Sequence, residues 1–190
     1  MKIGLFFGSF NPIHLGHLIV ANVMASSTDL EQVWFVVSPQ NPFKKNKQLL
    51  HEFDRLDMVE RAIADNPLLK VSDIEFAMPK PSYTIDTLVR LQEKFPQHNF
   101  KLIIGEDNLA QFANWKNHER ILEYVGLYVY PRPNSAPSPF VNHPNVKMIR
   151  APLLDISATF IRDCIKSGKP IRYMVPESVE NYIAIKGFYL

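Results

Sequence analysis

Two histidines near the start of the chain, His14 and His17, are the residues whose types and spacing best suit chemistry. Because they are three residues apart, they share one face of the first turn of a helix. The stretch before them, residues 8–12, follows an apolar run and contains the glycine and proline of a tight strand-to-helix turn. A helix start offers free N–H groups and a positive dipole end to an anion. Two imidazoles beside such a site predict phosphate chemistry.

A second anion site is predicted much later in the chain, over residues 156–162. Ser157 is a good helix N-cap, and the hydroxyl of Thr159 belongs to the first turn of the same helix. Arg162 follows about one and a third turns after Ser157 and projects from that helix. A helix start with hydroxyls and an arginine suits a phosphate. Capped helices that carry an arginine are common, so this segment gains its meaning only together with the histidines.

The elements that must position these residues alternate along the chain. We expect strands near residues 2–8, 33–37, 68–74, 100–104, 127–130 and 146–149, and helices near 14–27, 54–66, 84–95, 107–124, 157–167 and 176–186. This alternation predicts an α/β fold, a Rossmann-like, doubly wound parallel sheet with helices on both faces. Ligands of such sheets lie beyond the carboxyl ends of the strands, where the candidate residues fall. We read residues 1–190 as one domain, with a core over about 1–155 and a small C-terminal helical subdomain over about 156–190.

The composition is that of a globular chain of 190 residues, 46% of them apolar. With 21 basic and 19 acidic side chains and no long run of like charge, it does not suggest a nucleic-acid partner. The lone cysteine, Cys164, excludes an internal disulfide and is expected to be a small buried residue. No apolar run approaches the ~18 residues of a membrane span, and the first residues do not resemble a signal peptide. We therefore expect a cytoplasmic monomer or homodimer that binds no membrane.

Residues 8–17, Gly-Ser-Phe-Asn-Pro-Ile-His-Leu-Gly-His, resemble the G-[ST]-F-[DN]-P-x-H-x-G-H signature of the nucleotidylyltransferase superfamily. Residues 156–162 resemble the I-S-x-T-x-x-R signature of the same superfamily, with Ala158 where many members have a second serine. The resemblance implies that His14, His17 and Arg162 are catalytic. It also implies an ATP-binding set that comprises these three residues and Gly8, Ser9, Phe10, Lys45, Ser157 and Thr159.

Two further segments narrow the resemblance to the bacterial nicotinate-nucleotide adenylyltransferases. Residues 81–88 resemble P-S-Y-T-x-x-T-L, and residues 103–115 resemble I-I-G-x-D-x-L-x-x-F-x-x-W. The mononucleotide-binding residues so implied are Lys44, Ser82, Tyr83, Thr84, Gly105, Asp107, Trp115 and Arg132. Among them, residues 82–84 would hold the pyridine carboxylate, Asp107 the ribose hydroxyls, and Trp115 would stack on the ring. Taken locally, residues 82–84 could instead simply cap a helix, and Trp115 could be a core aromatic.

The resemblance implies adenylyl transfer from ATP to nicotinate mononucleotide, with Mg²⁺ bound through the ATP phosphates. Residues 41–44 are Asn-Pro-Phe-Lys where many members have Pro-Pro-His-Lys, so Lys44 or Lys45 would take over a phosphate contact. Nicotinamide mononucleotide or phosphopantetheine remain alternative acceptors. A metal site at the histidines lacks a third ligand nearby. A non-catalytic dinucleotide-binding module would have G-x-G-x-x-G in the first loop, which carries histidines instead.

Overall fold

The structure is a computed structural model that describes residues 1–40, 49–152 and 154–190. In these residues one sheet is formed by β1 (Lys2–Gly8), β2 (Gln32–Val37), β3 (Leu69–Ser72), β4 (Asn99–Gly105), β5 (Leu127–Tyr130) and β6 (Val146–Met148). The strand order is β3-β2-β1-β4-β5-β6, and every neighbouring pair is parallel. This is the strand order of a Rossmann fold, so the predicted doubly wound α/β architecture is confirmed.

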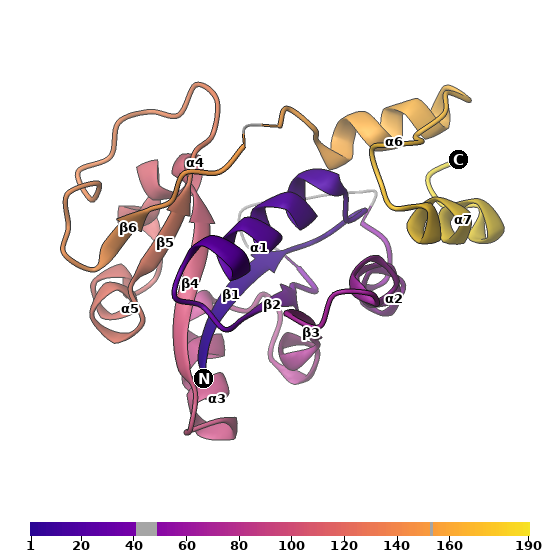
Figure 1. The fold of residues 1–190 in the computed structure, drawn as a ribbon. Coiled ribbons are helices and arrows are strands. Elements are labelled where there is room, and N and C mark those ends of the chain that lie inside the picture. The colour runs from indigo at the N-terminus through magenta and orange to yellow at the C-terminus, as the bar shows by residue number, and fades with distance from the viewer. Residues whose placement is uncertain (41–48, 153) are drawn as a thin grey trace.

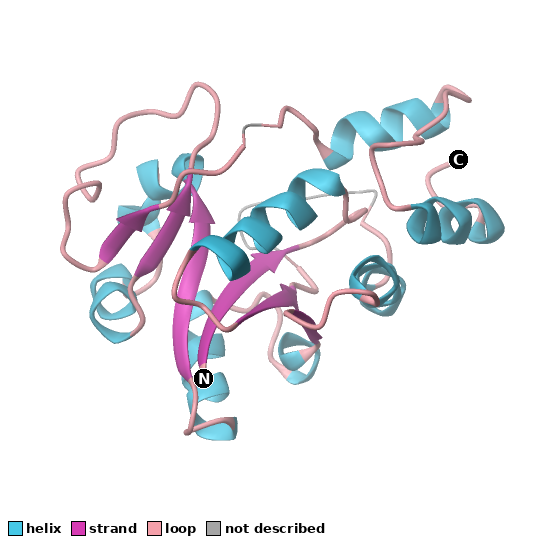
Figure 2. Cartoon of the chain, in the orientation of Figure 1, coloured by secondary structure: helices cyan, strands magenta, loops and turns pink. Residues whose placement is uncertain are grey.

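Helices cover both faces of the sheet, as Figure 2 shows. They are α1 (Leu15–Ser27), α2 (Glu52–Ile63), α3 (Thr84–Lys94), α4 (Glu106–Ala110), α5 (His118–Tyr124), α6 (Ala158–Lys166) and α7 (Glu177–Lys186), with 3₁₀ turns η1 (Ile74–Ala77) and η2 (Phe112–Asn114). None of the helices in the described ranges is long and apolar enough to cross a membrane.

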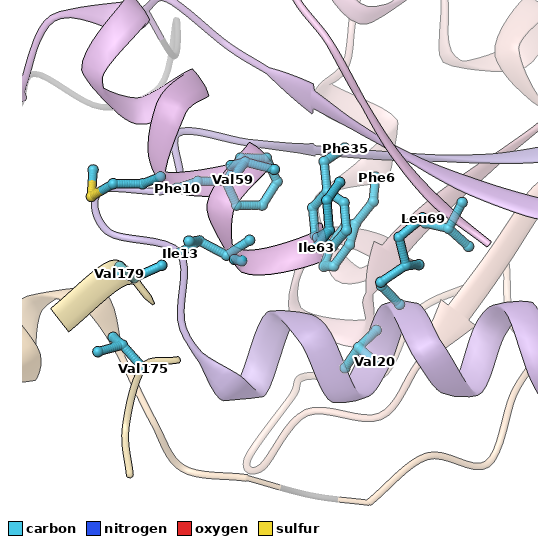
Figure 3. Close-up of a cluster of buried hydrophobic side chains, with 14 of the residues drawn as sticks. Phe6, Phe10, Ile13, Val20, Phe35, Val59, Ile63, Leu69, Val175 and Val179 are labelled. Atoms are coloured by element: carbon cyan, nitrogen blue, oxygen red, sulfur yellow. The ribbon is translucent and has the colours of Figure 1, made fainter. Parts of the chain in front are cut away.

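Alternating side chains of the strands divide the core into two clusters. On β1, Leu5 joins the cluster that contains residues of α3 and α5, whereas Phe6 joins the cluster under α1 and α2. Figure 3 shows the second cluster, where Phe6 and Phe35 of neighbouring strands lie near Val20 of α1 and Ile63 of α2. The sheet is thus buried on both faces, which explains the nearly continuous apolar runs of its strands.

The C-terminal helices share this core. Cys164 of α6 is buried, as expected, in the cluster that holds Phe6, and Val179 of α7 belongs to it too. Figure 1 shows α7 beside α2, where the Tyr182 hydroxyl donates to Asp57 at 3.0 Å. The helical subdomain is therefore packed directly on the Rossmann core. The exact boundary near residue 155 stays a prediction.

The connections leave β1 and β4 in opposite directions, towards β2 and towards β5. The carboxyl ends of these two neighbouring strands therefore flank the switch point of the sheet, where doubly wound proteins bind ligands. The predicted loops at residues 8–14 and 105–107 begin at these two ends.

Candidate active site

The two histidines form a stacked pair at the start of α1. His14 is the N-cap residue and His17 lies in the first turn, with ring centroids 3.7 Å apart and ring planes inclined by 27°. The backbone N–H of His14 donates to Nδ1 of His17 at 3.3 Å. A neutral imidazole that accepts at Nδ1 carries its proton on Nε2. His17 can therefore donate an Nε2–H hydrogen bond to an anion.

The surroundings of the pair favour neutral rings. Burial, together with the positive charge of Arg132, lowers the pKa of His14 to about 4. Burial also lowers the pKa of His17, and the charges of His14 and Arg132 lower it further. An anionic ligand would act in the opposite direction, because a negative charge close to the rings stabilises their protonated forms.

The pair faces a cavity of about 570 Å³, to which distant segments contribute. Its lining includes Gly8, Ser9, Phe10, Asn11, His14 and His17 from the loop after β1 and from α1; Asp107, Trp115 and Arg132 from the segments after β4 and β5; and Ser157, Thr159 and Arg162 from the start of α6. The two anion sites predicted from separate ends of the sequence therefore face the same space.

Arg162 links α6 to the loop after β1. Its Nη1 donates to the backbone carbonyl of Asn11 at 2.7 Å, and its Nη2 donates to the Thr159 hydroxyl at 3.2 Å. Ser157 caps the helix as predicted, since its hydroxyl accepts from the N–H of Phe160 at 3.2 Å. Nε of Arg162 is buried without a partner among the described residues, so the guanidinium keeps hydrogen-bonding capacity.

Arg132 brings a second guanidinium to the cavity. Its Nε lies 3.9 Å from a carboxylate oxygen of Asp107, and its backbone N–H donates to Glu106 at 3.1 Å. A glycine at the end of β4 leaves room for these side chains, because a β-carbon on Gly105 would lie 2.4 Å from the Asp107 carboxylate and 3.1 Å from the Arg132 side chain. Both Asp107 and Arg132 line the large cavity, and neither lines the smaller pocket beside it.

That smaller pocket, of about 140 Å³, adjoins the cavity. Its predicted residues are Ser82, Tyr83 and Thr84 at the start of α3, Gly105 at the end of β4, and Trp115. Gly8, Asn108 and Trp115 line both spaces, so the two lie side by side. An elongated ligand can therefore have one end in each.

The start of α3 and the ring of Trp115 each had a second, purely structural interpretation. No side chain caps α3, although Ser82 and Thr84 were possible caps, so helix capping does not explain this segment. Trp115 fits both interpretations, because its ring packs at 5.4 Å from that of Phe112 and also lines both spaces.

The two charged residues among those that line the pocket, Lys116 and Glu75, were not predicted from the sequence. Lys116 lies over the ring of Tyr83, 4.7 Å from its centroid, and forms an ion pair with Asp86 at 2.9 Å. Glu75 is 2% exposed and accepts from the Thr87 hydroxyl at 2.7 Å. The sequence signals for them were weak, namely a cation directly after Trp115 and a carboxylate inside the apolar run of residues 74–77.

Two residues of the predicted ATP set also pack against each other. Gly8 lines the cavity, and a β-carbon at this position would lie 2.7 Å from the ring of Phe10. Contact of Gly8 with a ligand stays a prediction. Phe10 is 2% exposed, and its ring packs against Phe6 and Phe35, so it anchors the loop after β1 to the core. Lys44 and Lys45 lie outside the described residues.

The comparisons with known proteins agree with this geometry. Residues 5–164 match the cytidylyltransferase-like family, a class of nucleotidyltransferases. The chain is 64% identical to a probable nicotinate-nucleotide adenylyltransferase of Cytophaga hutchinsonii, with 100% of this chain and 98% of that relative covered. It is 52% identical to the one of Flavobacterium psychrophilum, with 100% and 99% covered. The chain belongs to the nicotinate-nucleotide adenylyltransferase family.

A solved structure with the same fold is the Plasmodium falciparum nicotinic acid mononucleotide adenylyltransferase complexed with NaAD. It superposes with a TM-score of 0.83 at 19% identity, with 99% of this chain and 97% of that chain covered. At this identity the similarity shows the shared fold and no residue roles.

Proposed function

We propose that this chain transfers the adenylyl group of ATP to nicotinate mononucleotide and releases nicotinate adenine dinucleotide and pyrophosphate. The observation that carries the proposal is the convergence of His14, His17, Arg132 and Arg162 on one cavity that adjoins the pocket of Trp115. The names of the relatives give the same activity. The cavity suits a triphosphate and the pocket suits a planar ring.

The reaction is a displacement at the α-phosphorus of ATP. A phosphate oxygen of the mononucleotide attacks that phosphorus, while the bond to the oxygen bridging to the β-phosphate breaks and pyrophosphate leaves with the electron pair. The attacking phosphate is already an anion at neutral pH, because its second pKa is about 6. The protein therefore needs no general base, and its task is to hold two anions in line and to stabilise the developing charge.

For the ATP half, we assign His14 and His17 to the α-phosphate, where charge builds up in the transition state. Arg162, with the hydroxyls of Ser157 and Thr159, is assigned to the β- and γ-phosphates at the start of α6. The remaining members of the proposed ATP set are Gly8, Ser9, Phe10 and Lys45.

For the acceptor half, the start of α3 at residues 82–84 offers backbone N–H groups to the pyridine carboxylate. Trp115 provides a stacking surface for the cationic ring. Gly105 and Asp107 are assigned to the ribose, and Arg132 and Lys44 to the phosphate of the mononucleotide. Lys116 adds a positive charge to the pocket, which favours the acid over the amide.

Divalent metal use is general in this class of enzyme. In the described parts of the chain no three His, Cys, Asp or Glu side chains are grouped to hold a metal ion. We propose that Mg²⁺ enters with ATP, coordinated by the phosphates, because Mg²⁺ is commonly held by substrate phosphates and water.

The test is pyrophosphate release from MgATP with each of three acceptors: nicotinate mononucleotide, nicotinamide mononucleotide and phosphopantetheine. We expect turnover with the acid and a kcat/KM for the amide lower by at least about tenfold, since a hydrogen bond to a charged group contributes about 1.5–3 kcal/mol and about 1.4 kcal/mol is a factor of ten. Faster turnover with phosphopantetheine, or none with the acid, would contradict the proposal.

A further inference from the structure

Arg55 is the largest fully buried side chain of the described residues, with an exposed fraction of 0%. It lies on the inward face of α2, in line with Met58, Val59 and Ala62. The apolar neighbours alone do not explain a guanidinium at this place, since burying a cation costs free energy unless its N–H groups are hydrogen-bonded. Its partners indicate what it does.

Within the described residues, every hydrogen bond of the Arg55 side chain goes to a backbone carbonyl of a loop. Nη1 donates to Ser9 at 2.6 Å and to Ser38 at 2.8 Å, Nη2 donates to Pro39 at 3.1 Å, and Nε donates to Leu50 at 2.9 Å. These carbonyls belong to the segments after β1, after β2 and before α2. The planar fork of an arginine is suited to this task because its donors point in fixed, diverging directions.

The loops that Arg55 joins serve different halves of the site. Ser9 lines the large cavity of the histidine pair, whereas Ser38 lines the pocket of Trp115. A single nitrogen, Nη1, therefore bridges the two walls. The N–H of Ser38 also donates to the carbonyl of Gly8 at 2.9 Å, so the two loops are in direct contact beside the guanidinium.

We propose that Arg55 is a positioning residue for adenylyl transfer, which fixes the loop on the ATP side against the loop on the acceptor side. It lines neither the cavity nor the pocket, so it acts through the backbone of Ser9 and Ser38. In-line attack depends on the relative placement of two bound anions, and a displacement of about 1 Å costs of the order of 10²-fold in rate. The inference rests on the proposed function.

The test compares Arg55→Met and Arg55→Lys with Met58→Ala. Met58 is on the same helix and equally buried, but it lies in the apolar cluster and has no donor that could hold the carbonyls of these loops. At a temperature where all the variants are folded, we expect kcat to fall about 10²-fold in Arg55→Met and about tenfold in Arg55→Lys, whose single ammonium cannot reach all of the carbonyls. We expect kcat of Met58→Ala to stay within about twofold of the wild-type value, even if its melting temperature falls by as much as that of Arg55→Met.

A second measurement does not depend on turnover. Amide hydrogen exchange of Ser38, whose N–H is held by Gly8, should be at least about tenfold faster in Arg55→Lys than in Met58→Ala. Equal kcat and equal exchange in variants of matched melting temperature would overturn the inference. Wild-type protein that is inactive with every acceptor would instead refute the proposed function, and the exchange comparison would still decide the role of Arg55.

Discussion

At the scale of single residues, the strongest prediction concerns His17. Replacing it by alanine removes an Nε2–H donor from the cavity, and the loss of one transition-state donor lowers kcat by about 10²–10³-fold. The fold should survive, because the His17 side chain is partly exposed, beside the ring of Phe10, and does not belong to the buried apolar core. Circular dichroism and a coupled pyrophosphate assay measure the two effects. A fully active variant would exclude His17 from the mechanism.

The buried state of His14 makes stability depend on pH. Its pKa is about 4 in the folded protein, because of burial and the charge of Arg132, and about 6.5 in the unfolded chain. Between these pH values the unfolded state binds more protons than the folded state. The contribution of neutral His14 to the free energy of unfolding is therefore complete above pH 6.5 and is lost as the pH falls towards 4. The total loss is roughly 3 kcal/mol.

Urea unfolding between pH 7 and pH 5 measures this effect before most carboxylates titrate. We expect His14→Asn to reduce the slope of the pH profile, with the remaining slope due to His17, whose pKa burial also lowers. If the profile of His14→Asn matches that of the wild type, protonation of His14 does not limit the stability of the fold.

Lys116 is predicted to contribute to the choice between acid and amide. The substitution Lys116→Met removes a cation that is already paired with Asp86 and whose side chain is 46% exposed, so the effect is moderate. We expect KM for nicotinate mononucleotide to rise about two- to fivefold, and KM for ATP and for the amide to change little.

The control for this variant is Lys147→Met. Lys147 also lies over a tyrosine ring, that of Tyr128, and is paired with Asp29, but it lines neither the cavity nor the pocket. A similar rise in KM for the acid and the amide in Lys116→Met would show that the lysine acts on the phosphate or on packing and not on the carboxylate.

At the scale of elements, the start of α6 carries a separable prediction. Ser157→Ala removes the hydroxyl that caps the helix and should cost about 1 kcal/mol of stability, together with a several-fold increase in KM for ATP. Ser157→Asp restores a good cap but places a negative charge beside the phosphates.

We therefore expect Ser157→Asp to recover the stability and to bind ATP more weakly than Ser157→Ala does. Thermal unfolding and steady-state kinetics give the two readouts. If stability and ATP binding recover together in the aspartate variant, Ser157 acts only as a helix cap.

Most of these elements could be predicted from periodicity alone, because each strand and helix has a continuous or regularly spaced apolar face. The region expected to hold one or two helices over 107–124 is divided into α4, η2 and α5. The second break, directly before α5, includes Asn117, whose φ of 54° lies in the left-handed region. Such a local backbone conformation has only a weak signal in the sequence.

At the scale of the whole molecule, the motifs predicted which residues gather but not how they are supported. His14 and Arg162 belong to recognisable patterns, so their shared cavity follows once the fold is known. Arg55 has no motif, and its only sequence signal is a cation on the apolar face of α2. Its partners are backbone carbonyls, which leave no trace in the sequence of the loops they belong to.

The strand order could not be predicted from local sequence patterns either. The alternation of strands and helices predicts a doubly wound sheet, but whether β1 and β4 lie side by side depends on how the crossovers pack. Their adjacency creates the switch point and brings Gly8 and Gly105 to the same crevice. The site is thus a property of the complete fold, in which residues 8 and 162 face one space.

The most direct measurement is a crystal structure of the protein with a non-hydrolysable ATP analogue. The account predicts that the triphosphate occupies the cavity of about 570 Å³, within hydrogen-bond distance of the His14–His17 pair and of the Arg162 guanidinium. A triphosphate bound instead beside Ser82 and Trp115, with the histidine pair and Arg162 out of contact, would contradict it.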